Sequence, residues 1–209
     1  TKQLHKAVNM AIYYLRTPLQ EEDVRKLKVG DAIYLTGIVV TARDAAHRRM
    51  IEYLREGKPL PIDLKGGAIY HCGPVVEKIN DEWRVVSGGP TTSTRMELYE
   101  ADIIKHFGVR LIIGKGGMGS KTAQACKEFG AVYTTFTGGA GVLVGNAIKR
   151  VIRAEWLDLG IPEALWVLDV ENFGPLLVTI DTTGRNLTEE VIEGAKRKRE
   201  EILKKLGVI

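Results

Sequence analysis

The residues best suited to chemistry in this sequence lie in glycine-bearing loops. The first loop runs Ser-Gly-Gly-Pro-Thr-Thr-Ser-Thr-Arg-Met from Ser87 to Met96. Glycines let a backbone approach a ligand closely, and hydroxyls and amides at a helix N-terminus bind anions. Arg95, four residues after Thr91, adds a planar guanidinium that suits a carboxylate or phosphate. Taken alone, the stretch fits a capped helix with an exposed arginine equally well.

A second glycine loop runs Gly-Lys-Gly-Gly-Met-Gly from Gly114 to Gly119, after one predicted strand and before a predicted helix. Lys115 in this loop is interpreted as a cation held close to a small anion. The loop and the residues after it come near to the phosphate-binding pattern G-x-x-x-x-G-K-[ST], but Ser120 shifts the spacing by one residue. The sequence therefore disfavours a nucleotide site here.

A third candidate is Arg43, at the junction of a predicted strand over Ala32–Val40 and a helix reaching about Leu54. Arginine at a strand-to-helix junction suits anion binding, although a solvated basic helix start is an equally good reading. His47 is four residues further on, so one helix face could present both side chains.

Composition limits the function classes. The chain has 209 residues with 44% hydrophobic and 27% charged residues, an ordinary balance for a globular protein. A net charge of +4 gives no support for a nucleic-acid surface and fits attraction of small anions. No run of eighteen apolar residues and no signal peptide is evident, so we expect a cytoplasmic protein without a membrane contact.

Periodicity predicts alternating strands and helices in one α/β domain spanning residues 1–209. One helix is expected near each end of the chain, over Gln3–Leu15 and over Thr188–Leu206. Thr188 is expected to cap the second helix. The apolar stripe of this helix is formed by Val191, Ala195, Ile202 and Leu206. Further helices are expected over Met96–Phe107, Ser120–Phe129 and Gly145–Leu157. Further strands are expected over Trp83–Val86, Ala68–Cys72, Val109–Ile113, Ala131–Thr137, Ala164–Val170 and Leu176–Asp181.

Cysteine usage argues against a metal centre built by this chain alone. Cys72 and Cys126 are the two cysteines, and neither belongs to a C-x-x-C pair. A structural zinc site usually needs four ligands, and an iron-sulfur cluster needs about three or four thiolates. His71, beside Cys72 at a strand end, is interpreted as structural. We therefore predict no metal ligand in this chain.

Several motifs in order carry a family resemblance. They are G-D-A-I-Y-L-T-G-I-V-V-T-A-R-D-A-A-H from Gly30, G-G-A-I-Y-H-C-G-P from Gly66, S-G-G-P-T-T-S-T-R-M from Ser87, G-K-G-G-M from Gly114 and W-V-L-D-V-E-N-F-G-P-L-L-V-T-I-D from Trp166. Together they resemble the β subunit, or C-terminal domain, of class I iron-sulfur fumarate hydratases and the related L-tartrate dehydratases. The likeness extends from about Leu15 to Asn186.

The resemblance implies a fold, a reaction and a partner. The fold would be a single swivelling β/β/α domain with a mixed sheet and flanking helices. The reaction would be the reversible dehydration of (S)-malate to fumarate in a hetero-oligomer. A 4Fe-4S cluster, bound by a partner α subunit and not by this chain, would act as Lewis acid. Thr91 would be the catalytic base, while Arg43, Arg95 and Lys115 would bind the dicarboxylate substrate.

Alternatives stay open at this stage. Thr92 adjoins Thr91 and is a second candidate for the base or for substrate binding. A threonine base needs nearby cations and amides, because its hydroxyl is far from the near-neutral pKa that proton transfer favours. L-tartrate is an alternative substrate. The chain could also be a non-catalytic module that binds a dicarboxylate or scaffolds a partner.

Overall fold

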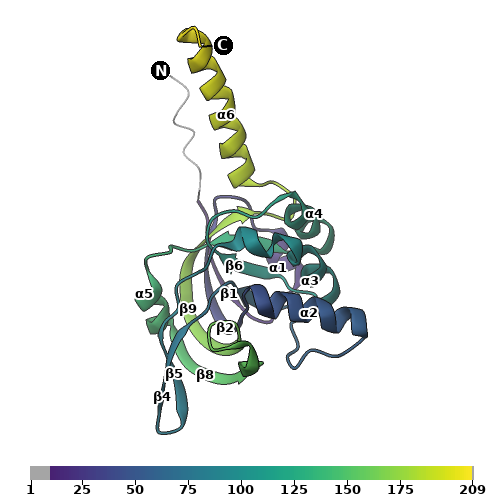
Figure 1. Ribbon diagram of the computed structural model, residues 1–209, viewed down its shortest axis with the longest axis vertical. Coiled ribbons are helices and arrows are strands. Elements are labelled where there is room, and N and C mark those ends of the chain that lie inside the picture. Colours follow the sequence, from purple (N-terminus) through teal and green to yellow (C-terminus); the bar gives the residue numbers. More distant parts are fainter. Residues whose placement is uncertain (1–9, 209) are drawn as a thin grey trace.

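The computed structural model describes residues 10–208, in which a curved mixed sheet is covered by helices on one side (Figure 1). Its parallel strands lie in the order β1-β2-β3-β6-β7. They are β1 (Ile12–Arg16), β2 (Ala32–Thr41), β3 (Ala68–Tyr70), β6 (Leu111–Gly114) and β7 (Val132–Thr135). The long strand β9 (Leu165–Ile180) runs antiparallel to both β7 and β2, and so closes a ring of strands. Strand β8 (Ile148–Glu155) pairs with β9 outside that ring.

Alternating side chains of the parallel strands divide the core in two. Ala68, Tyr70, Leu111 and Ile113 face a cluster enclosed by β2 and β9, whereas Ile69 and Ile112 face the helices. This is the period-two alternation of a strand buried on both faces. The helices on that side are α2 (Asp44–Glu56), α3 (Glu100–Phe107) and α4 (Ser120–Phe129). The predicted α/β domain with a mixed sheet and flanking helices is confirmed.

The remaining elements are short or peripheral. Helix α1 (Glu21–Arg25) links β1 to β2, and α5 (Gly141–Ala147) precedes β8. Two short 3-10 helices are η1 (Ser93–Leu98) and η2 (Leu157–Leu159). Strands β4 (Val75–Ile79) and β5 (Glu82–Ser87) form a separate hairpin. Its turn, Asn80–Asp81, has positive φ at both residues, as a tight two-residue hairpin turn requires.

The N-terminal helix prediction was wrong where it can be checked. Ile12–Arg16 forms strand β1, which pairs in parallel with Ala32–Thr36 of β2. The β-branched and aromatic run Ile-Tyr-Tyr favours a strand, and pairing with β2 decides the outcome. The first part of the predicted helix, residues 3–9, lies outside the described residues.

Other predicted boundaries changed for tertiary reasons. The expected helix over Gly145–Leu157 ends at Ala147, because the chain then joins the edge of β9 as strand β8. The two strands expected over Ala164–Val170 and Leu176–Asp181 are one strand, β9, which bends at Asn172 where φ is positive. The helix expected over Met96–Phe107 begins as the 3-10 turn η1 and becomes α3 at Glu100.

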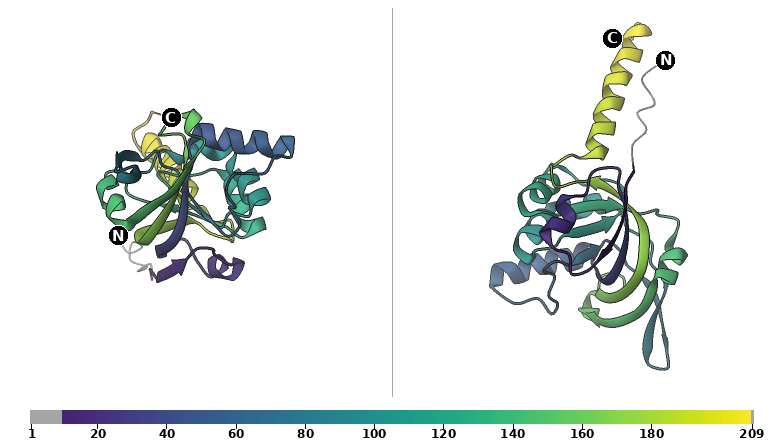
Figure 2. Two further views of the ribbon diagram at one scale, coloured as in Figure 1. Left: turned by 90° about the horizontal axis from the view of Figure 1, so that it is seen from below. Right: turned by 180° about the vertical axis from the view of Figure 1, so that it is seen from behind.

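The C-terminal helix α6 (Leu187–Lys205) projects away from the sheet, as Figure 1 and the right-hand view of Figure 2 show. Its N-cap is Asn186, whose side chain accepts from the amides of Thr188 and Glu189, and not the predicted Thr188. No residue of α6 is buried. The predicted apolar stripe, which includes Val191 and Leu206, is therefore solvent-exposed.

Candidate functional site

The predicted site residues gather at one edge of the sheet. Arg43 follows β2 and Lys115 follows β6, and these strands are parallel, so their carboxyl ends share an edge. The loop after β5 joins the same edge, where the Thr91 amide donates to the His71 carbonyl at 2.7 Å. Thr92 pairs with Lys115 in an isolated parallel bridge. Segments far apart in the sequence thus converge at this edge of the sheet.

Arg95 connects the candidate base Thr91 with Asp44 at the start of α2. Its Nη2 donates to Thr91 Oγ1 at 2.8 Å, and its Nε lies 3.0 Å from Asp44 Oδ1. The planar guanidinium can make both contacts because its donors form a rigid fork. Thr91 is half-buried, and the Arg95 side chain is 46% exposed. A cation therefore touches the hydroxyl predicted to act as the base.

Arg43 pairs with an acid from a distant loop. Its Nε lies 3.2 Å from Glu163 Oε1, and the other oxygen of Glu163 accepts from the Ala45 amide at the start of α2. His47 does not share an exposed face with Arg43: its ring is buried, and its Nδ1 lies 2.8 Å from the Arg43 carbonyl oxygen. The expectation that one helix face presents both side chains was wrong.

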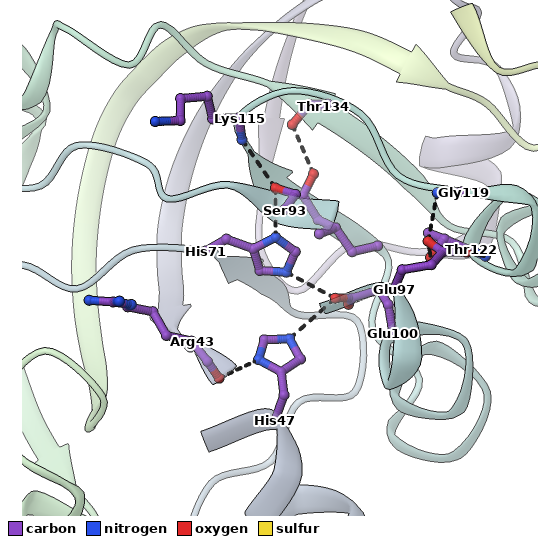
Figure 3. A network of polar contacts seen from close by, with 11 residues as sticks. Arg43, His47, His71, Ser93, Glu97, Glu100, Lys115, Gly119, Thr122 and Thr134 are labelled. Carbon is purple, nitrogen blue, oxygen red and sulfur yellow. Dashed lines mark hydrogen bonds and ion pairs between the residues drawn. The ribbon is translucent and has the colours of Figure 1, made fainter. Parts of the chain in front are cut away.

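Lys115 extends from its glycine loop toward the same side as Arg43 (Figure 3). Its side chain passes over Gly138, where an added Cβ would lie 2.8 Å from Lys115 Cδ. The Lys115 side chain makes no ion pair within residues 10–208. The ammonium group is thus available to an external anion. Thr92 is exposed beside it and makes no capping hydrogen bond with its side chain.

Beneath these residues lies a fully buried polar network (Figure 3). Glu100 Oε2 lies 2.9 Å from His71 Nε2 and 3.2 Å from His47 Nε2. His71 Nδ1 lies 2.9 Å from Ser93 Oγ, which also accepts from the Lys115 amide at 3.1 Å. All four side chains are completely shielded from solvent.

The surroundings fix which groups of this network carry charge. Burial alone would raise the pKa of Glu100, but His71 and His47 outweigh burial and lower the pKa to about 2. Burial lowers the pKa of His71, against the opposing attraction of Glu100. Glu100 is therefore ionised and His71 neutral near pH 7. His47 donates to the Arg43 carbonyl through Nδ1, because a carbonyl oxygen can only accept, and its Nε2 faces the Glu100 carboxylate.

The second glycine loop is held by an internal anion. The Glu97 carboxylate accepts from the amides of Gly119, Lys121 and Thr122 and from the Thr122 hydroxyl. It thereby satisfies the free amides at the start of α4, which a phosphate would occupy in a nucleotide-binding loop. This contact supports the sequence argument against a nucleotide site.

Within residues 10–208, one group of three metal-ligating side chains lies close enough together to share an ion. It consists of the buried His47, His71 and Glu100. Their atoms are already within hydrogen-bonding distance of one another, and protons between them account for the contacts. Cys72 and Cys126 lie in the two separate core clusters, and burial raises the pKa of the Cys72 thiol to about 12. A protonated, isolated thiol is a poor cluster ligand.

Sequence reasoning missed Ser93, Glu97, Glu100 and Glu163. Glu97 and Glu100 lie in an amphipathic segment where acids are usually solvated, so only the fold reveals their buried contacts. Glu163 comes from a distant loop with no motif of its own. Ser93 lay within the quoted loop, and a small polar residue between Thr92 and Thr94 gave no separate signal.

Comparison with known proteins identifies the class to which this fold and site belong. The family model described as "Fumarase C-terminus" matches residues 2–191. The chain therefore belongs to the fumarase C-terminus family, as the motif resemblance predicted.

Three named relatives show which enzymes of this family the chain is similar to. The chain is 46% identical to the L(+)-tartrate dehydratase subunit beta of Escherichia coli K12, over 92% of this chain and 94% of that one. It is 45% identical to a putative L(+)-tartrate dehydratase subunit beta of Methanocaldococcus jannaschii, over 91% and 98% of the two chains. It is also 45% identical to a putative class I fumarate hydratase of Geobacillus stearothermophilus, over 88% of this chain and 35% of that longer protein. These named relatives are hydro-lyases.

None of the helices described between residues 10 and 208 has both the length and the apolar character that a bilayer-spanning helix needs.

Proposed function

We propose that this chain is the β subunit of a two-subunit hydro-lyase that reversibly dehydrates a hydroxydicarboxylate. The observation that carries the proposal is the 2.8 Å hydrogen bond from Arg95 to Thr91 Oγ1, at the edge where Arg43 and Lys115 also converge. It pairs a cation with the hydroxyl that must become a base. The names of full-length relatives support the β-subunit assignment.

The cations account for recognition of a dianion. Arg43, Arg95 and Lys115 come from different loops, so they can surround a small substrate and bind its carboxylates at separate points. Arg43 and Arg95 are each partly neutralised by one acid, Glu163 and Asp44, which fixes the guanidinium planes. Lys115 contributes the uncompensated charge.

Thr91 is proposed to take the proton from the substrate carbon. A threonine hydroxyl is a weak base precursor, and hydrogen bonding from the Arg95 guanidinium stabilises its deprotonated form. Thr92 lies next to it and is exposed, and we assign it to substrate binding beside Lys115.

The 4Fe-4S cluster implied by the family does not fit the residues of this chain. Its two cysteines are buried, protonated and in different core clusters. We propose that the partner α subunit holds the cluster. What this chain supplies is carboxylate binding, orientation and proton transfer. A hetero-oligomer in the cytoplasm is the corresponding proposal for assembly and location.

Two substrates remain candidates. (S)-Malate follows from the motif resemblance to class I fumarases, whereas the two relatives that match along almost their full length are named for L(+)-tartrate. Both are hydroxydicarboxylates with one carboxylate at each end, so the three cations serve either. Malate and tartrate differ by one hydroxyl group. Arg43, Arg95 and Lys115 are proposed to bind carboxylates, so these cations do not distinguish the two substrates.

The test is anaerobic co-expression with the cluster-bearing partner, followed by turnover of malate and of L-tartrate in parallel. Activity on either supports a hydro-lyase, and the larger kcat/KM identifies the substrate. An intact, cluster-loaded complex that is inert on both would contradict the proposal. Tight dicarboxylate binding by this chain alone would then favour the non-catalytic module.

A further inference from the structure

Glu100 is the hub of the buried network, since a single oxygen, Oε2, serves both histidines. The other oxygen, Oε1, is buried without a hydrogen-bond partner among the described residues. A buried carboxylate with one bare oxygen is costly, and apolar residues of similar size often stabilise a fold better. Stability alone is therefore a poor explanation for this arrangement.

The arms of the network end on the main chain of the candidate site residues. His47 Nδ1 donates to the Arg43 carbonyl at 2.8 Å. The main-chain carbonyl of His71 accepts from the Thr91 amide at 2.7 Å. Ser93 Oγ accepts from the Lys115 amide at 3.1 Å, and the Ser93 amide donates to the Lys115 carbonyl at 3.1 Å.

We infer that His47, Glu100, His71 and Ser93 form a positioning network that holds the main chains of Arg43, Thr91 and Lys115 in one fixed arrangement. The inference rests on the proposed function for the roles of those three residues. None of the four network side chains touches the substrate, because all are fully buried. The network acts by fixing the main-chain positions from which the side chains of Arg43, Thr91 and Lys115 reach the substrate.

The hydrogen bonds have one consistent arrangement of protons. Ser93 accepts from Lys115 and donates its hydroxyl proton to His71 Nδ1. Neutral His71 then donates from Nε2 to Glu100, and His47 donates from Nδ1 to the Arg43 carbonyl. The network therefore contains a continuous chain of hydrogen bonds from the Glu100 carboxylate through His71 and Ser93 to the Lys115 amide.

Gly114 supports this assignment. A Cβ at this position would overlap Ser93 Oγ and would lie 3.1 Å from His71 Nδ1. The absence of a side chain at Gly114 makes room for the hydrogen bonds between Ser93, His71 and Lys115. The role of Gly114 is thus internal to the network.

The first test uses the assembled enzyme with Glu100→Gln, and Asp102→Asn as its matched control. Asp102 is an exposed acid on the same helix, so its substitution removes the same charge without touching the network. We expect Glu100→Gln to lower kcat per active site by about 100-fold and to raise KM severalfold, since small misplacements of reacting groups have effects of about this size. Asp102→Asn should behave as wild type. Unchanged kcat and KM in correctly assembled Glu100→Gln enzyme would overturn the inference.

A narrower variant guards against a folding failure of Glu100→Gln. Ser93→Ala removes only the contacts to His71 and the Lys115 amide and leaves the His47–Glu100 pair intact. We expect a raised KM with a smaller loss of kcat, because Lys115 binds substrate and Thr91 is held through the main chain of His71. A kcat loss without any KM change would contradict the assigned role of this arm.

The second test needs no catalysis and uses the full β chain. Imidazole ¹⁵N spectra should show a proton on His47 Nδ1 and on His71 Nε2, the nitrogens that face the Arg43 carbonyl and the Glu100 carboxylate. Amide hydrogen exchange at Thr91 and Lys115 should be slow, and faster in Glu100→Gln and Ser93→Ala, respectively. If these nitrogens carry no proton and amide exchange is unchanged in the variants, the network inference fails. If these results hold but the complex is inert, the proposed function alone fails.

Discussion

Arg95 Nη2 donates a 2.8 Å hydrogen bond to Thr91 Oγ1, while the Nε of the same guanidinium lies 3.0 Å from Asp44 Oδ1. A donor with a fixed fork thus links the turn after β5 to the start of α2. The Thr91 oxygen keeps a lone pair that can accept a proton, and the Arg95 guanidinium beside it stabilises negative charge on that oxygen.

Thr91→Ala should lower kcat by about 10²- to 10⁴-fold, the usual contribution of a general base. Thr91→Ser, which keeps the hydroxyl, should retain most activity. Thr92→Ala should act chiefly on KM, because Thr92 lies beside Lys115. Steady-state kinetics of the assembled enzyme decides the point. Near-normal kcat in Thr91→Ala with a large loss in Thr92→Ala would move the base by one residue.

Arg95→Lys should not be a conservative substitution. An ammonium cannot reproduce the two simultaneous contacts to Thr91 and Asp44 that the guanidinium fork makes. We expect kcat/KM to fall at least about tenfold, which corresponds to about 1.4 kcal/mol of transition-state stabilisation. Arg48→Lys is the control, because Arg48 is an exposed arginine of α2 that pairs with Glu52. Equal effects of the two substitutions would argue against a fork at Thr91.

Acid should destabilise the fold through the buried network. The pKa of Glu100 is lowered from 4.5 to about 2, so the unfolded state binds more protons in that interval. The stabilisation from Glu100 is present above pH 4.5 and is lost as the pH falls toward 2. The pKa of His71 is lowered below 6.5, which acts in the same direction from that pH downward.

Urea unfolding followed by tryptophan fluorescence at a series of pH values measures this effect. The free energy of unfolding should decrease on acidification, and the decrease below pH 4.5 should be shallower in Glu100→Gln than in wild type. Asp102→Asn serves again as the exposed control. Parallel pH profiles for all three proteins would show that Glu100 has the same proton affinity in both states.

Glu97→Ala should destabilise α4 without abolishing folding. The carboxylate accepts hydrogen bonds from the Gly119, Lys121 and Thr122 amides and from the Thr122 hydroxyl. Loss of an N-terminal helix cap costs about 0.5–2 kcal/mol. A thermal unfolding scan should therefore give a lower Tm, whereas Glu128→Ala, an exposed acid at the other end of α4, should leave it near wild type. Equal Tm values would mean that water replaces the cap.

Local patterns in the sequence predicted much of the parallel part of the fold. Helix Ser120–Phe129 was predicted at its observed bounds, and the strands at β2, β3 and β6 were located within a few residues. These elements have strong β-branched or amphipathic patterns bounded by glycine. In contrast, β8 and the unbroken β9 depend on pairing with each other, and nothing local distinguishes Ile148–Glu155 from a helix continuing from α5.

The residues of the candidate site also divide into those that sequence patterns indicated and those that they did not. Arg43, Thr91, Arg95 and Lys115 were located by motifs at strand ends, and the structure brings their segments together. The acids beneath and beside them were not predicted, because Glu163 reaches Arg43 from a separate loop and Glu100 is buried in a segment whose pattern predicts solvated acids. Such contacts follow from the tertiary fold and leave no local pattern.

The most direct test of the account is anaerobic mixing of the purified β chain with its separately purified, cluster-loaded partner. Appearance of the dehydrated product from malate or tartrate should require both chains, and should be lost when the β chain carries Thr91→Ala. Full turnover by the partner alone, or by the mixture with Thr91→Ala, would contradict the claim that this chain supplies the base.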